Sequence, residues 1–184
     1  AEESRNKTSS EEETETKTSS EQSSNTSWSP VLDMIASAES NGRYDIIYGG
    51  EIVDGITEMT IAQAAKRAGD QGDGKNYAVG KYQFITLTKQ AEAAGLDPQK
   101  DKFSPANQDK IAIHLIEKKR KITKQMAKKN PTEAAKRLAM EWAGLPVLKD
   151  TKGHKKDVTR GQSYYAGDGV NKATVTPEAV EASF

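Results

Sequence analysis

Glu39 is the residue of this chain whose surroundings most favour acid–base chemistry. It ends a short apolar segment, VLDMIASAE, that begins at Val31, and a polar turn follows it. A carboxylic acid at the end of an apolar helix can lie against a low-dielectric wall at the edge of a cleft, and such burial raises its pKa. A carboxyl that keeps its proton near neutral pH can donate it to a leaving group. We therefore interpret Glu39 as a general acid, with a solvent-exposed helix end as the alternative.

A second group of residues, YAVGKYQF at positions 77–84, has the composition of a ligand-binding wall. Gly80 allows a ligand to approach the backbone, and the amide of Gln83 can bond sugar hydroxyls or N-acetyl groups. Tyr82 offers an amphipathic ring for stacking. The same pattern also fits a strand end that packs its aromatic residues into a core. The G-x-x-Q spacing alone does not decide between these interpretations.

These residues require a scaffold, and the sequence predicts an α+β, mainly helical domain with one small β element. Apolar residues recur at helical spacing after Ser29 and Pro30, a typical pair for a helix start, and glycines follow several other periodic segments. Residues 43–53 are rich in Ile and Tyr and are broken by Gly49 and Gly50, which predicts a β-hairpin. The expected helices span residues 30–39, 60–68, 85–94, 105–128, 131–144 and 177–183.

Composition divides the chain of 184 residues into three parts. Residues 1–27 hold seven Glu against three basic residues, with no apolar residue beyond Ala1. Such a segment cannot bury enough apolar surface to offset the entropy of ordering. We expect residues 1–28 to form a disordered acidic linker rich in Ser and Thr, and residues 29–150 to form the catalytic domain. Residues 151–184 are expected to be a C-terminal extension with a short helix.

The composition also argues against several kinds of site and partner. The chain has no cysteine and two histidines, so we expect no metal and no cofactor. The loop of residues 70–76, DQGDGKN, lacks the spacing and closing Glu of an EF-hand. The basic run of residues 109–129 could attract an anionic polymer such as a bacterial envelope or a nucleic acid. A solvated helix face explains it better, because no aromatic residues separate the lysines. No apolar run is long enough for membrane insertion.

Five ordered blocks between Val31 and Pro146 resemble the family of the lambda phage endolysin, lytic transglycosylases with a lysozyme-like fold. The blocks are LDMIASAE, NGRYDIIYGGE, GKYQF, FSPANQDKIAI and WAGLP. The resemblance implies a lysozyme-like fold with the hairpin, or a three-stranded sheet, beside the active-site cleft. It also identifies Glu39 as the catalytic glutamate. The chain departs from the family pattern between Glu39 and Tyr44, where it is short, and over residues 56–76, which have no close counterpart.

The resemblance implies a set of substrate-binding residues around the acid. These residues are Ser40, Tyr48, Glu51, Gly80, Tyr82 and Gln83. Ser40 follows the acid directly, as in the wider group of soluble lytic transglycosylases. Glu141 and Trp142, in EWAGLP, lie at the end of an expected helix, and we interpret them as structural.

The number of carboxylates at the site decides the mechanism. A lysozyme that hydrolyses its substrate uses an acid and a second carboxylate, about 5 to 10 Å apart across the scissile bond. Asp45, Glu51 and Asp54 are the candidates for this second carboxylate, although a solvated hairpin edge would also explain them. A transglycosylase needs only Glu39. The resemblance favours this route, in which the bond between N-acetylmuramic acid and N-acetylglucosamine is cleaved to give a 1,6-anhydromuramoyl end.

Two alternatives to a free transglycosylase stay open. The first is a hydrolytic lysozyme, or muramidase, that uses a second carboxylate. The second is a non-catalytic structural module of a phage tail, since residues 161–180 resemble the ends of virion-attached phage lysins. The expected partners are accordingly a peptidoglycan glycan strand and, in a virion, tail or baseplate proteins. Such a protein would be found in the phage virion, or in the host cytoplasm before lysis, and would act on the bacterial cell wall.

Overall fold

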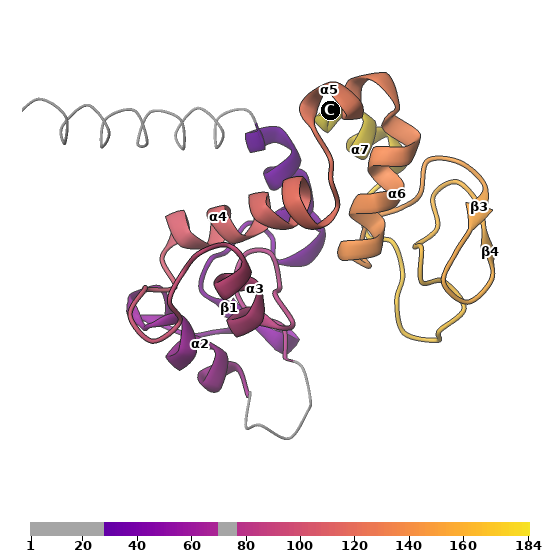
Figure 1. Cartoon of the computed structure of the whole chain (residues 1–184). Helices are drawn as coiled ribbons and strands as arrows, with labels where there is room; N and C mark the ends of the chain where they lie inside the picture. The colour runs from indigo at the N-terminus through magenta and orange to yellow at the C-terminus, as the bar shows by residue number, and fades with distance from the viewer. Residues whose placement is uncertain (1–27, 70–76) are drawn as a thin grey trace, which may run out of the picture.

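The computed structural model describes residues 28–69 and 77–184 of the chain. This part is mainly helical, with two small antiparallel sheets of two strands each (Figure 1). The expectation of a mainly helical α+β fold is therefore confirmed. The acidic segment before Trp28 and the loop of residues 70–76 lie outside the described residues, and so do the predictions made for them. The first helix covers residues 28–39. The other elements are β1 (Ile46–Ile47), β2 (Glu51–Ile52), α2 (Ile61–Ala68), α3 (Leu87–Ala93), α4 (Pro105–His114), α5 (Lys124–Lys129), α6 (Pro131–Glu141), β3 (Thr151–Lys152), β4 (Asp157–Val158) and α7 (Pro177–Ser183).

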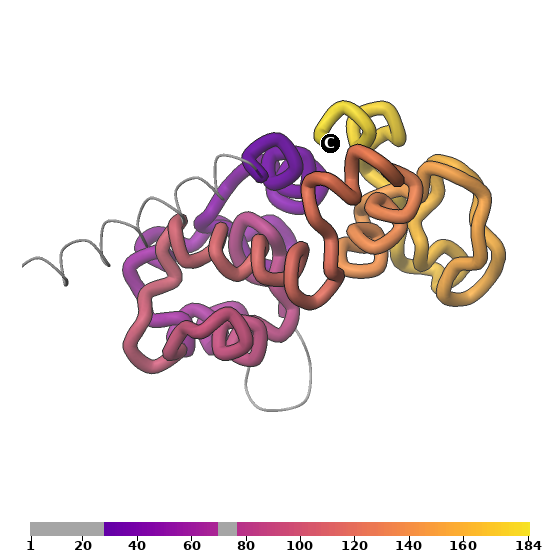
Figure 2. Tube along the Cα trace, turned by 45° about the horizontal axis from the view of Figure 1, so that its top comes forward, coloured from indigo at the N-terminus to yellow at the C-terminus, as the bar shows by residue number. Residues whose placement is uncertain are grey.

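The elements form two lobes with central helices between them (Figure 1). The N-terminal lobe contains the hairpin of β1 and β2 together with α2 and α3. The C-terminal lobe contains α5, α6, α7 and the hairpin of β3 and β4. The first helix and α4 lie between the lobes, as a second direction of view also shows (Figure 2). This arrangement brings the end of the first helix to the junction of the two lobes.

Side-chain caps start several helices where the sequence predicts them. At α2 the Thr60 hydroxyl accepts the amide N–H of Gln63, and the Gln63 side chain accepts the amide N–H of Thr60. Asn130 and Thr176 accept backbone N–H bonds at the starts of α6 and α7, each followed by a proline. These starts are confirmed. The expected stop of α2 at Gly69 is confirmed as well, because Gly69 has the left-handed conformation that ends a helix.

The start expected for the first helix is wrong. Trp28 and Ser29 are already helical, so Ser29 is not the N-cap. Trp28 is 2% exposed, and its indole Nε1–H donates to the Glu117 carboxylate at 2.6 Å. Burying this ring while satisfying its N–H outweighs the preference of Ser29 for a cap position, which is worth about 1 kcal/mol.

The first hairpin forms with Ile47 paired to Glu51 across a turn of three residues, Tyr48–Gly50. The two glycines of this turn have φ values of 81° and 82°, which residues with a Cβ rarely adopt. Val79 makes isolated bridges to Ile47 and Phe84. The alternative of a three-stranded sheet is therefore limited to these bridges in the described part of the chain.

The long helix expected over residues 105–128 is wrong, because the structure breaks it. One π-helical turn, Leu115–Lys119, follows α4, and Lys121 then has a φ of 54°, outside the helical region. Thr123 caps α5 as a separate helix. In sequence, the run of lysines fits one long helix as well as it fits two helices with a break between them. The break depends on tertiary packing. Ile122, which lies in the sequence between the π-helical turn and α5, is fully buried.

The segment after α6 shares its core with the helices before it. The Val147 amide donates to the Gln162 carbonyl at 2.9 Å, and the Gly161 amide donates to the Val147 carbonyl at 2.9 Å. Val158 and Val180 are each 1% exposed. The sequence does not predict β3 and β4, because strands of two residues carry no periodic pattern. α6 also stops at Glu141, earlier than expected, and the chain then turns toward the junction of the lobes.

Candidate functional site

A pocket of about 550 Å³ lies at the junction of the two lobes. Its lining comes from the end of the first helix, the segment that leads into α3, the π-helical turn, the end of α6 and the C-terminal segment. A concave site bordered by several elements can hold a ligand in one orientation. Among the lining residues are Glu39, Gln83, Gln90, Lys119, Arg120 and Glu141.

Glu39 reaches this pocket from the end of the first helix. Its Oε1 atom is buried and has no hydrogen-bond partner among the described residues. Burial raises the pKa of the Glu39 carboxyl above its ordinary value, and the backbone of Gly144 opposes this shift only in part. The setting favours the protonated carboxyl, which is the form that can act as an acid.

Gly144 allows the acid to lie close to the C-terminal lobe. A Cβ at this position would be 3.0 Å from Glu39 Oε1 and 3.2 Å from Thr174 Oγ1. Thr174 donates its backbone N–H to the Gly144 carbonyl at 2.9 Å and its hydroxyl to the Ala38 carbonyl at 3.2 Å. The C-terminal segment is therefore attached directly beside the acid.

Ser40 has a different environment from the one expected of a substrate-binding residue. It is 4% exposed, and its hydroxyl donates to the Lys81 carbonyl at 2.6 Å. The bond ties the end of the first helix to the segment that contains Gln83. Ser40 therefore positions the residue before it rather than facing the pocket.

Gly80, Tyr82 and Gln83, the residues expected at the cleft wall, do not share one environment. Gly80 is buried, and a Cβ there would be 2.4 Å from Gln108 Oε1 and 2.5 Å from Phe103 Cζ, so this glycine is required by packing. Tyr82 is fully buried and donates its hydroxyl to Asp109 at 2.6 Å. Gly80 and Tyr82 are thus core residues, and neither is among the residues that line the pocket with Glu39. Gln83 does line the pocket.

Gln83 has a backbone conformation that is costly for a residue with a Cβ. Its φ is 48°, in the left-handed region, and its side-chain Nε2–H donates to the Gly80 carbonyl at 2.9 Å. Strained positions of this kind gather at functional sites, where surrounding contacts hold them. One such contact is close by, since the Trp142 indole donates to the Tyr82 carbonyl at 2.9 Å. This bond joins the end of α6 to the segment that presents Gln83.

The carboxylates of the first hairpin do not line the pocket. Glu51 is exposed and pairs with Arg67 at 2.6 Å. Asp45 pairs with Arg43 at 2.9 Å, and this guanidinium lowers the pKa of the Asp45 carboxyl. Asp54 is exposed.

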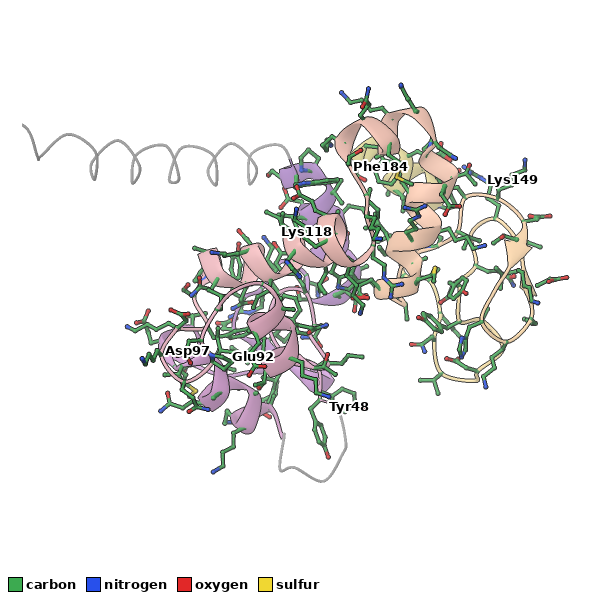
Figure 3. All side chains as sticks on the ribbon, in the orientation of Figure 1. Tyr48, Glu92, Asp97, Lys118, Lys149 and Phe184 are labelled. Carbon is green, nitrogen blue, oxygen red and sulfur yellow. The ribbon has the colours of Figure 1, made fainter. Side chains whose placement is uncertain are left out.

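Tyr48, also expected near the cleft, is 67% exposed at the hairpin turn, and its side chain points outward from the N-terminal lobe (Figure 3). Its ring makes an edge contact with Tyr77, with centroids 6.3 Å apart. Tyr48 is absent from the residues that line the pocket with Glu39.

The structure adds a charged cluster to the pocket that the sequence did not predict. The Glu141 carboxylate, 6% exposed, accepts from Lys119 Nζ at 2.8 Å and from Arg120 Nη2 at 2.8 Å. All three residues line the pocket. Lys119 is the last residue of the π-helical turn, and Arg120 follows it. The cluster therefore depends on the break in the expected long helix. No local pattern in the sequence could have revealed it.

Gln90, in α3, is a second pocket residue that the sequence did not single out. Its side-chain Oε1 is buried and has no hydrogen-bond partner in the described part of the chain. A buried acceptor without a donor costs free energy, and a ligand N–H or O–H can satisfy it. The two unpartnered buried side-chain oxygens of the described residues, on Glu39 and Gln90, belong to the same pocket.

The residues that the structure describes contain no group of three or more His, Cys, Asp and Glu side chains suited to a metal ion. Within the same residues, no helix has the length and apolar character needed to cross a membrane.

The bond between Ser40 and Lys81 gives a prediction about stability. Ser40→Ala leaves the Lys81 carbonyl without its buried donor, and we expect a loss of about 1 to 3 kcal/mol in the free energy of unfolding. Ser37→Ala is the matched control, because Ser37 lies in the helix that ends just before Ser40 but is exposed, and its hydroxyl donates to the Met34 carbonyl. Its effect should stay within about 0.5 kcal/mol. Chemical denaturation measures both variants, and equal losses would contradict the role given to Ser40.

Comparison with known proteins identifies one family. A family model described as Endolysin matches residues 26–171 of the chain. The match covers the first helix, both lobes up to Asn171 and all the pocket residues described above. Among curated proteins, none matches the chain.

Proposed function

Since the chain belongs to the Endolysin family, we propose that it cleaves the bond between N-acetylmuramic acid and N-acetylglucosamine with Glu39 as acid and base. Endolysins are phage enzymes that degrade peptidoglycan, so the substrate and the site of action, the bacterial cell wall, follow from the family. The observation that carries the proposal is the Glu39 carboxyl, which lines the pocket with one oxygen buried and unpartnered.

In the first step, the protonated Glu39 carboxyl donates its proton to the glycosidic oxygen. The bond from this oxygen to C1 of the muramic residue then breaks, and the N-acetylglucosamine leaves with a new hydroxyl. Positive charge develops at C1 as the bond breaks. Burial supports this step, because a carboxyl with a raised pKa still carries its proton where an exposed glutamate would have lost it.

In the second step, the Glu39 carboxylate takes the proton from the C6 hydroxyl of the same muramic residue. The C6 oxygen attacks C1 and closes a 1,6-anhydro ring, which restores the protonated acid without consuming water. One carboxyl group is sufficient for both steps, since the proton that it gives up in the first step returns in the second.

The positions of the other carboxylates support this route over hydrolysis. Asp45, Glu51 and Asp54 stand outside the residues that line the pocket. Glu141 does line it, but its carboxylate is bonded to Lys119 and Arg120. A carboxylate held by two cations is a poor base or nucleophile, because removing it from them costs the energy of both contacts. Glu39 is thus the carboxyl in the pocket with a free oxygen.

Neutral amides form another part of the polar lining of the pocket. Gln83 and Gln90 both line the pocket, and an amide can bond the hydroxyl and N-acetyl groups of a sugar as donor and acceptor. The unpartnered Oε1 of Gln90 is suited to the N–H of an N-acetyl group. Ile85, an exposed residue, lines the same pocket and adds an apolar surface.

Mass analysis of digested peptidoglycan tests the reaction. Purified sacculi incubated with the protein are expected to release muropeptides with 1,6-anhydromuramoyl ends, about 18 Da lighter than the hydrolysed products because no water is added. Borohydride reduction supplies the control, since it reduces hydrolytic muramic ends but leaves anhydro ends unchanged. Reducible muramic ends without anhydro products would show a muramidase instead.

A further inference from the structure

Two cations that line the pocket, Lys119 and Arg120, share one neutralising carboxylate. Lys119 and Arg120 both contact the single Glu141 carboxylate, so the three residues together carry one net positive charge. Arg120 and Glu141 are 19% and 6% exposed at their side chains, whereas Lys119 is 50% exposed. The excess charge therefore lies on the side chain that is most accessible to a ligand.

The hydrogen bonds of the cluster leave donors available. Lys119 Nζ contacts the two Glu141 oxygens at 2.8 and 2.9 Å, and an ammonium group has three N–H donors. Arg120 uses Nε and Nη2 on Glu141 and on the Met140 carbonyl. Glu141 fixes both cations in place, as a paired buried carboxylate does, and Lys119 keeps a donor for an anion from outside.

The backbone that presents the two cations is itself unusual. Lys119 ends the π-helical turn Leu115–Lys119, and the amide of Arg120 donates to the Leu115 carbonyl at 2.9 Å. π-helical turns are rare and are frequently found at functional sites. The turn also holds Glu117 on Trp28 while Lys119 and Arg120 line the pocket, so one turn of chain reaches both the core and the ligand space.

From these observations we propose that Lys119, supported by Arg120 and Glu141, binds a carboxylate of the stem peptide that the muramic residue of the substrate carries. The proposal rests on the function proposed above, because it takes peptidoglycan as the substrate. The polar lining of the pocket is divided accordingly. Neutral amides of Gln83 and Gln90 serve the uncharged sugar rings, and the cations serve the charged substituent.

Binding measurements on full-length protein test this assignment. The Glu39→Gln background prevents turnover, and calorimetry then gives the Kd of two ligands with the same number of sugars. One is a muropeptide fragment that bears stem peptides, and the other is an uncharged chito-oligosaccharide. Lys119→Met is expected to weaken binding of the muropeptide about 10-fold and to change the Kd of the chito-oligosaccharide less than about 2-fold.

Two control variants separate charge from structure. Lys118→Met removes the same charge from the neighbouring residue, which is exposed and does not line the pocket, and should leave both Kd values unchanged. Lys119→Arg keeps the charge and should retain muropeptide affinity. Higher salt should weaken the muropeptide more than the chito-oligosaccharide in the parent protein, and this difference should vanish in Lys119→Met.

The outcomes distinguish this proposal from the proposed function. If Lys119→Met weakens both ligands equally, or neither, the carboxylate subsite is wrong while peptidoglycan stays the substrate. If the parent protein binds neither ligand and wild type releases no muropeptides from sacculi, the proposed function fails and the subsite fails with it.

Discussion

Glu39→Gln is expected to abolish peptidoglycan cleavage, with a fall in kcat of about 10³-fold or more. The amide has nearly the shape of the protonated carboxyl but has no proton to give to the glycosidic oxygen. Since the same group acts as the base in the second step, both steps lose their catalyst. Release of soluble muropeptides from purified sacculi measures the effect.

The same variant should be more stable than wild type at neutral pH. Burial raises the pKa of the Glu39 carboxyl above its ordinary value of 4.5, so between these two values the folded chain holds a proton that the unfolded chain has lost. The stability of wild type therefore falls as the pH rises through this window, and the full cost of the buried charge is present above it. Gln carries no charge, so its advantage in Tm should appear above about pH 4.5 and vanish below it.

Activity should follow the same ionisation. Wild-type kcat/KM is expected to fall as the pH rises through the raised pKa of Glu39, because the acid form is lost. Asp54→Asn is the control for the catalytic role, since Asp54 is an exposed hairpin carboxylate outside the pocket, and it should keep wild-type activity. Full activity of Glu39→Gln would disprove the assignment of the acid. Loss of activity in Asp54→Asn would indicate a mechanism with two carboxylates.

Gly80→Ala is expected to lower the free energy of unfolding by about 4 kcal/mol, more than the other variants proposed above, and the Tm by roughly 8 to 16 °C. The added Cβ would be 2.4 Å from Gln108 Oε1 and 2.5 Å from Phe103 Cζ. Both neighbours are fully buried, and Gln108 bonds three backbone groups around this segment, so neither can move away cheaply. The φ of 81° at Gly80 adds strain for any residue with a Cβ.

Gly95→Ala separates the two causes. Gly95 has nearly the same φ, 84°, but a Cβ there would meet nothing within 4 Å. We therefore expect the free energy of unfolding of this variant to fall only by the cost of a left-handed backbone at a residue with a Cβ, about 1 to 2 kcal/mol. Thermal unfolding followed by circular dichroism measures both proteins. Equal losses would mean that the contacts of Gly80 with Gln108 and Phe103 contribute nothing to its requirement for glycine.

The sequence predicts best where the cause of a structure is local. Asn130 and Thr176 cap helices that begin where the sequence predicts them, because a cap depends on a side chain and a backbone group three residues away. The first hairpin likewise follows from its two glycines. In each case the deciding contacts lie within a few residues of the pattern.

The errors arise where contacts between distant residues decide. The sequence pattern around Tyr82 fits both a cleft wall and a core, whereas in the structure Tyr82 is fully buried and bonded to Asp109 in α4. Lys119 and Glu141 are 22 residues apart, and their contact requires the π-helical turn that breaks a regular helical pattern. Gln90 is identified by its buried Oε1, which has no hydrogen-bond donor among the described residues, and this is a property of the folded chain.

The attachment of the C-terminal segment beside Glu39 has a consequence for synthesis of the protein. A chain emerges from the ribosome N-terminus first, and its early parts can fold before its late parts exist. Glu39 is made early, whereas Tyr165 and Asn171, which line the pocket, and Thr174, which bonds to Gly144, are made more than a hundred residues later. A nascent chain that already carries its acid therefore has no finished pocket, and translation itself delays the appearance of the site.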